Sequence, residues 1–162
     1  MTAIAVPPGI PGIGALLAAR PDTAEPLTAL AQQLLRGPSP LSAGVREAIA
    51  AQVSLGNDCA YCHGTHAAAA EALLADEEQD TRLPALLAVA EAVRRGGQVP
   101  VAVLSAARAA GADDDALHDT VLIAAAFCMY NRYVDGLATP DVADPQEYPA
   151  IAARLVRYGY GR

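Results

Sequence analysis

The stretch that decides the fold of this chain is residues 45–70, which read VREAIAAQVSLGNDCAYCHGTHAAAA. Apolar side chains recur at three- and four-residue spacing before Gly56, which predicts an amphipathic helix that ends at this glycine. Asn57 or Asp58 is expected to cap a second helix, whose run of four alanines permits close contact with a neighbour. The stretch therefore predicts a helical hairpin, which we place at residues 40–75.

The remainder of the chain also predicts helices. Gly and Pro punctuate a series of helical patterns, with little of the alternation of β-branched residues that indicates strands. Besides the hairpin, the expected helices are one or two within 13–35, then 83–95, 99–110, 113–136 and a short one after 149. Within the long helix, residues 121–129 are expected to be buried on all sides. The fold class is all-α, a single-domain helical bundle, with an extended N-terminal arm at 1–14, the domain at 15–157 and a C-terminal tail at 158–162.

Composition and charge exclude several classes of protein. The chain has 162 residues, of which 53% are hydrophobic, enough for one domain with a core that needs no disulfides. Its eleven basic residues are all arginine and are outnumbered by eighteen acids, and no basic cluster interleaves with aromatics, so we expect no nucleic-acid partner. The start of the chain has no signal-peptide pattern, and no segment approaches the ~18 apolar residues of a membrane span. We therefore expect a cytoplasmic protein with no membrane partner.

Three cysteines are an odd number, and in a reducing compartment they indicate catalytic or metal chemistry rather than a disulfide framework. At about 100° per residue, Cys59, Cys62, His63 and His66 fall within one sector of a helix surface. Cys59 and Cys62 are one turn apart, close enough for a disulfide, near a helix N-terminus that stabilises a thiolate. His66 follows Cys62 by four residues and could accept or relay its proton.

Glu47 joins this group through the geometry of the hairpin. At about 1.5 Å per residue, Glu47 lies about 14 Å before the turn near Gly56, and His66 lies about 12 Å after it. The carboxylate and the imidazole are therefore expected at the same height on adjacent helices. In that position Glu47 could orient His66 and raise its basicity, as a carboxylate does in a catalytic triad.

Metal and haem binding are rival interpretations of the same residues. Cys59, Cys62 and one of His63 or His66 supply three zinc ligands, but a structural site needs four and no second Cys/His pair follows. The letters from Cys59 to His63 also match the c-type haem attachment pattern, which normally follows export. We favour neither, and no nucleotide or flavin fingerprint is present. We expect no cofactor apart from a redox-active disulfide between Cys59 and Cys62. We expect His63 to face solvent.

Other polar and aromatic residues have simpler interpretations. Cys128 lies in an apolar run and is expected to be a packed core thiol. His118 follows an acidic run and is expected at the surface. Asn131 lies where an apolar helix ends, and we expect it to bond to neighbouring polar side chains or another subunit, with a role in a site as the less favoured alternative. Tyr158 and Tyr160 of the tail either pack at an interface or lie in solvent.

Together these residues resemble the alkylhydroperoxidase D-like, carboxymuconolactone decarboxylase superfamily. Its redox-active branch carries a glutamate, eleven residues, a cysteine, two residues, a second cysteine, three residues and a histidine. Glu47, Cys59, Cys62 and His66 stand at that spacing. The resemblance extends over roughly residues 40–136, and the arm and the tail add nothing to it.

The resemblance implies an all-α fold that assembles into homo-oligomers, usually trimers or hexamers, and reduces hydroperoxides. It implies that Cys62 attacks the peroxide and Cys59 resolves it, while His66 and Glu47 relay protons. It further implies re-reduction by a dihydrolipoyl protein or another dithiol. One position departs from the pattern: some peroxidases of the superfamily have a second histidine where this chain has Tyr61.

Two other classes of function stay open at the level of sequence. One is decarboxylation or lactone chemistry like that of the superfamily's namesake, which uses this fold without the cysteine pair. The other is a non-peroxidatic disulfide oxidoreductase or a redox sensor, whose cysteines would oxidise without peroxide turnover. The presence of Cys59 and Cys62 favours redox chemistry over decarboxylation.

Overall fold

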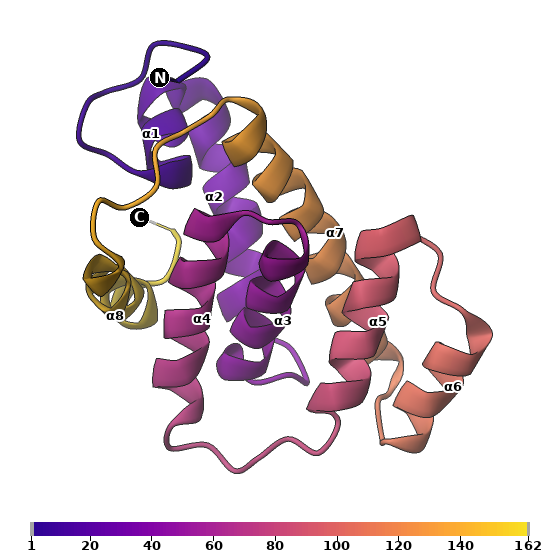
Figure 1. Cartoon of the computed structure of the whole chain (residues 1–162). Helices are drawn as coiled ribbons and strands as arrows, with labels where there is room; N and C mark the ends of the chain where they lie inside the picture. Colours follow the sequence, from indigo (N-terminus) through magenta and orange to yellow (C-terminus); the bar gives the residue numbers. More distant parts are fainter. Residues whose placement is uncertain (1, 162) are drawn as a thin grey trace.

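The structure is a computed structural model that describes residues 2–161, and the prediction of an all-α fold is confirmed (Figure 1). No strand occurs within those residues. The helices are α1 Gly12–Ala19, α2 Pro21–Arg36, α3 Ala43–Gly56, α4 Ala60–Leu74, α5 Leu83–Gly96, α6 Val101–Ala109, α7 Asp114–Gly136, the 3-10 helix η1 Pro145–Glu147 and α8 Tyr148–Tyr158. In this described part of the chain, no helix has the length and apolar character needed to cross a bilayer.

The hairpin of α3 and α4 lies at the centre of the single domain. Its two helices share the most extensive interface in the molecule, and α8 covers another side of α4 (Figure 1). Helix α3 also packs against α5 and α7, so it is enclosed on nearly all sides. Polar side chains on α3 are therefore forced into the interior, where each needs a partner.

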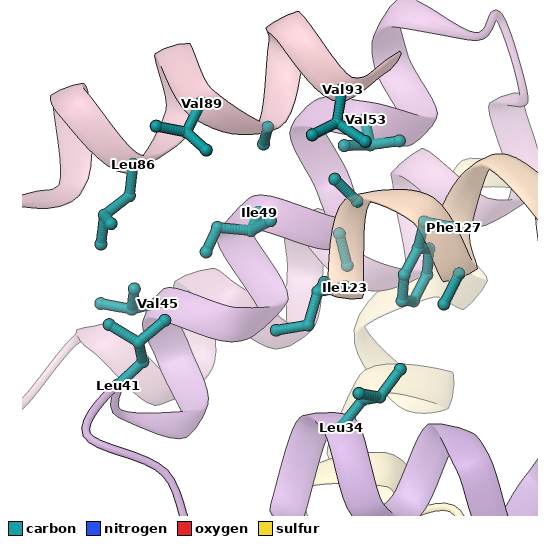
Figure 2. Packing of buried hydrophobic residues seen from close by; sticks show 14 of the residues in the cluster. Leu34, Leu41, Val45, Ile49, Val53, Leu86, Val89, Val93, Ile123 and Phe127 are labelled. Atoms are coloured by element: carbon teal, nitrogen blue, oxygen red, sulfur yellow. The ribbon is translucent and has the colours of Figure 1, made fainter. Parts of the chain in front are cut away.

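The core holds α3 in place through one apolar stripe. Figure 2 shows its side chains directed at those of α5 and α7. The residues are Val45, Ile49 and Val53 from α3, Leu86, Val89 and Val93 from α5, and Ile123 and Phe127 from α7. Each buried aliphatic side chain contributes about 1.5–3 kcal/mol relative to exposure. A helix fixed by this many contacts is a rigid support for functional groups.

The N-terminal segment differs from the extended arm expected at 1–14. Helix α1 begins at Gly12, so the last residues of that range are helical. Two backbone hydrogen bonds join the N-terminal segment to the segment that follows α7. Ala3 N donates to Leu137 O at 2.9 Å, and Gly12 N, at the start of α1, donates to Pro140 O at 2.8 Å. The N-terminal segment is thus docked against the end of α7.

Helix α7 corrects a second expectation, that 121–129 is buried on all sides. Its face with Ile123 is buried in the core, but Leu122, Ala125 and Met129 are exposed. The physical reason is that α7 packs on α3 and α5 with one side only, which leaves the opposite side free. Hydrophobicity alone does not distinguish a fully buried helix from one with an apolar outer face.

Candidate active site

The turn between α3 and α4 places the two cysteines at the start of α4. Asp58 reverses the chain with a left-handed φ of 59°, and Cys59 N donates to Ser54 O at 3.0 Å. Cys59 itself is then the N-cap residue of α4, without a side-chain cap, which corrects the expectation that Asn57 or Asp58 caps this helix. Cys62 lies in the first turn, where N–H groups lack helical partners and the helix dipole favours a thiolate.

Both cysteines are free thiols and both are buried. Cys59 is 1% exposed and Cys62 is 4% exposed. They pack with Val134 of α7 in a small apolar cluster, against which Ile13 of α1 and Tyr61 of α4 are also packed. The pair therefore lies beneath the N-terminal segment, away from the main core.

The pKa values of the two thiols are shifted in opposite directions. The hydrogen bond from Cys59 lowers the pKa of Cys62, against the opposing effect of burial, and a hydrogen bond from Asn131 lowers it further. The same bond to Cys62, together with burial, raises the pKa of Cys59. Of the two thiols, Cys62 is therefore the one whose ionisation the site favours.

Asn131 is held in this site by a network of amides and a hydroxyl. The side chain is 1% exposed, its Nδ2 donates to Ser54 Oγ at 3.0 Å, and its Oδ1 accepts from Asn57 Nδ2 at 2.9 Å. Asn57 Nδ2 also lies 3.6 Å from Cys128 Sγ. Asn131 thus has polar partners as expected, and its effect on the pKa of Cys62 favours the alternative in which it also serves the site.

Glu47 and His66 meet across the hairpin, as the helix arithmetic predicts. His66 Nδ1 lies 2.6 Å from Glu47 Oε2, and both side chains are buried. The edge of the His66 ring packs against Phe127, with ring centroids 4.6 Å apart at 87°. With Nδ1 donating to the carboxylate, Nε2 is the nitrogen that can exchange a proton with a reacting group.

Glu47 has two further partners that the sequence analysis did not find. Arg36 of α2 donates to Glu47 Oε1 at 2.6 Å, and the hydroxyl of Tyr160 donates to the same oxygen at 2.7 Å. Burial alone would raise the pKa of Glu47, but His66, Arg36 and the Tyr160 hydroxyl together lower it. The carboxylate is therefore ionised, with all of its strong partners inside the fold.

Comparisons with known proteins agree with this geometry. The sequence profile of the carboxymuconolactone decarboxylase family matches residues 21–94, which include the four motif residues. An uncharacterized peroxidase-related protein from Silicibacter sp. TM1040 is similar, with 26% identity and a TM-score of 0.75 over 91% of this chain and 94% of that one. The family match and the similar structure both support the alkylhydroperoxidase D-like, carboxymuconolactone decarboxylase superfamily for this chain.

Other solved structures extend the comparison. The alkylhydroperoxidase AhpD core of an uncharacterized peroxidase-related protein from Ralstonia eutropha JMP134 has 25% identity and a TM-score of 0.75, over 88% of this chain and 81% of that one. A protein of unknown function from Agrobacterium tumefaciens, with 17% identity and a TM-score of 0.69 over 89% of this chain and all of that one, shows the fold alone. A search of curated proteins gave no match. The matched family is one of enzymes.

Tyr61, which stands where some peroxidases of the superfamily have a second histidine, helps to cover the two cysteines. A Cβ added at Gly12 would lie 2.0 Å from the Tyr61 ring, so the ring rests directly on the Gly12 backbone. Burial raises the pKa of the Tyr61 hydroxyl, which therefore stays protonated. Tyr61 thus joins the N-terminal segment to the helix that carries the cysteines.

Replacing Gly12 by alanine is expected to make the thiols of Cys59 and Cys62 accessible to solvent. The new methyl would clash with Tyr61 and strain a φ of +56°, which together should cost about 3 kcal/mol of unfolding free energy. The measurement is the rate at which iodoacetamide alkylates the cysteine pair, together with the thermal stability. Gly9→Ala is the matched control, because Gly9 has a φ of +76° but no atom within 4 Å of an added Cβ. Equal alkylation rates in the two variants would show that the Gly12 contact does not shield the pair.

The remaining candidate residues lie outside this constellation. His63 is half-buried rather than solvent-facing, because its Nδ1 lies 3.1 Å from Ala51 O across the hairpin. His118 is exposed beside Asp119, as expected for a surface residue. Among residues 2–161, no group of three or more His, Cys, Asp or Glu side chains is arranged to hold a metal ion.

Proposed function

We propose that this protein is a thiol-dependent peroxidase of the alkylhydroperoxidase kind, which reduces hydroperoxides through a dithiol–disulfide cycle of Cys59 and Cys62. The observation that carries the proposal is the pair of buried free thiols at the start of α4, of which Cys62 has the lowered pKa. The similarity to peroxidase-related proteins supports the same chemistry. The reaction needs no cofactor beyond the Cys59–Cys62 disulfide and fits a reducing compartment such as the cytoplasm.

In the first step, the Cys62 thiolate attacks the terminal oxygen of the hydroperoxide. A sulfur–oxygen bond forms, the O–O bond breaks, and an alkoxide leaves and takes up a proton to become the alcohol. Cys62 is now a sulfenic acid. The Cys59 thiol then attacks its sulfur, so that a disulfide forms and water leaves before a second peroxide can oxidise Cys62 further.

The second half of the cycle restores the thiols. A dithiol, such as the dihydrolipoyl group of a partner protein, attacks the Cys59–Cys62 disulfide through a mixed disulfide and leaves as its own disulfide. The two electrons that reduced the peroxide thus come from the donor. The burial of both sulfurs favours a donor with a slender reactive arm over one that presents a rigid flat surface.

His66 and Glu47 serve as the proton relay in this proposal. Glu47 accepts from Nδ1 and fixes the ring, which leaves Nε2 to take the proton that the Cys62 thiol loses and then to give it to the leaving alkoxide. The burial of the pair supports this role, since a dry carboxylate holds an imidazole more strongly than a solvated one.

Assembly into a homo-oligomer is part of the proposal. The exposed apolar side chains Leu122, Ala125 and Met129 on one side of α7 support it, because a monomer would leave them in water.

The deciding experiment measures hydroperoxide consumption by the wild-type protein with excess dihydrolipoamide. Many turnovers per protein are expected, and mass spectrometry after one equivalent of peroxide should find Cys59 linked to Cys62 with Cys128 still reduced. Consumption no faster than the protein-free mixture would overturn the peroxidase. If the disulfide then still formed with other oxidants and was reopened by dihydrolipoamide, a non-peroxidatic disulfide oxidoreductase would replace it.

A further inference from the structure

The C-terminal tail folds back into the bundle after α8. Gly159 turns the chain with a φ of +69°, and a Cβ at this position would lie 2.4 Å from Gln32 Oε1. The same Gln32 oxygen accepts from Tyr160 N at 2.6 Å and from Gly161 N at 3.1 Å. The tail is therefore anchored to α2 by its backbone, which the expectation of a separate tail at 158–162 did not include.

This anchorage places the Tyr160 side chain against the relay. Its hydroxyl donates to Glu47 Oε1 at 2.7 Å and lies 3.3 Å from His66 Nδ1. Its ring lies nearly parallel to the imidazole, with centroids 6.0 Å apart at 14°, and the Arg36 guanidinium lies 5.2 Å from the ring centroid. The Tyr160 side chain thus contacts Glu47, His66 and Arg36.

Burial raises the pKa of Tyr160 well above its ordinary value, and the Glu47 charge raises it further. The phenol therefore stays protonated and acts as a donor at neutral pH. Because Tyr160 and Arg36 both donate to Oε1, the carboxylate is turned so that Oε2 faces His66. Without the phenol, Arg36 alone would hold Oε1, and the carboxylate could rotate about its last bond.

We propose that Tyr160 is a positioning residue of the relay: its hydroxyl fixes the Glu47 carboxylate toward His66, and its ring keeps water from the Glu47–His66 hydrogen bond. The proposal rests on the thiol-peroxidase function, since it assigns Tyr160 to the same relay. It also makes a structural statement that needs no peroxide, because the exchange of the His66 Nδ1 proton with water can be measured without turnover. Full activity would then require residues 159–161 to be docked on α2.

The test compares Tyr160→Phe with the wild type and with Tyr158→Phe, a neighbouring tyrosine that is 64% exposed. Tyr160→Phe keeps the ring and removes only the hydroxyl, and it should lower kcat for the hydroperoxide roughly tenfold while KM changes less than about twofold. In nuclear magnetic resonance spectra, the His66 Nδ1 proton should exchange with water at least about tenfold faster than in the wild type. Tyr158→Phe should match the wild type in both measurements.

Gly159→Ala provides a second variant that keeps Tyr160 but strains the turn that docks it. It should show the same faster exchange and the same loss of kcat. Wild-type proton exchange and kcat in Tyr160→Phe would overturn the proposal. If the wild type does not turn over peroxide, the proposed function fails, and the exchange of the His66 proton alone decides the role of Tyr160.

Discussion

Cys62→Ser is expected to abolish hydroperoxide turnover, with a residual rate equal to that of the protein-free mixture. The reason is that Cys62 is the attacking thiol in the proposed cycle, and its pKa is the lowered one of the pair. A serine hydroxyl at this position stays protonated and cannot attack the O–O bond at neutral pH. The measurement is steady-state peroxide consumption with dihydrolipoamide as the reductant.

Cys59→Ser separates attack from resolution. If Cys62 attacks, this variant should consume about one equivalent of peroxide and stop, with Cys62 as a sulfenic acid that a dimedone-type reagent traps. The rate of the single turnover should stay close to that of the wild type, because the serine hydroxyl can donate to Cys62 in place of the thiol. Cys128→Ser is the control and should retain full turnover. A trapped sulfenic acid on Cys59 in the Cys62→Ser protein would reverse the order of attack.

The contact between Glu47 and His66 was predictable because a hairpin is local. Two helices that meet at Gly56 are set in register by the rise per residue, so residues at similar distances from the turn must face each other. The 2.6 Å contact follows from this register and from the burial of the α3 face that carries Glu47. The cysteines were predictable in the same way, as neighbours at the start of the second helix.

The remaining members of the site depend on contacts that no local pattern encodes. Tyr160 is 113 residues from Glu47 in sequence, and its position depends on the docking of the tail on α2. Arg36 reaches Glu47 only because α2 packs beside α3. The glycines on both sides of Tyr160 were the one local sign of a tight turn, and they do not say where the turn leads.

The residues that shield the two thiols also owe their positions to tertiary contacts. Ile13 and Tyr61 shield the pair because the N-terminal segment docks on the end of α7, a contact made by backbone groups. Backbone hydrogen bonds do not depend on the identity of the side chains, so the sequence pattern does not predict them. The sequence therefore predicts which groups react, and the tertiary fold decides which groups orient and enclose them.

Glu47→Gln is expected to lower kcat by roughly 10²–10³-fold, because it inverts the tautomer of His66. Arg36 and Tyr160 both donate to Oε1, so the amide oxygen of the glutamine should take that position. The amide nitrogen then faces His66 and donates to Nδ1, which must become an acceptor. The ring proton moves to Nε2, and the nitrogen that should accept a proton from the thiols is blocked.

The measurement is kcat for the hydroperoxide, together with the ¹⁵N chemical shifts of the His66 ring, which report the tautomer directly. Glu71→Gln, the same change on the exposed side of α4, is the matched control and should leave both kcat and the ¹⁵N chemical shifts unchanged. A wild-type kcat in Glu47→Gln, with the tautomer inverted, would remove the relay from the mechanism and leave the thiol chemistry intact.

The same variant should also change how stability depends on pH. The folded-state pKa of Glu47 is lowered from 4.5, so its ionised form stabilises the fold above the unfolded pKa, and this contribution is lost as the pH falls through the folded value. At pH 7, Glu47→Gln should be less stable by about 2 kcal/mol, since Arg36 loses its counter-charge but keeps an acceptor. Urea unfolding should show this difference shrinking as the pH falls below about 4.5, because the wild type alone loses a carboxylate there. Other carboxyls with lowered pKa, such as Glu91, titrate in both proteins and cancel in the comparison. A constant difference across this range would mean that the Glu47 cluster orients His66 without stabilising the fold through its charge.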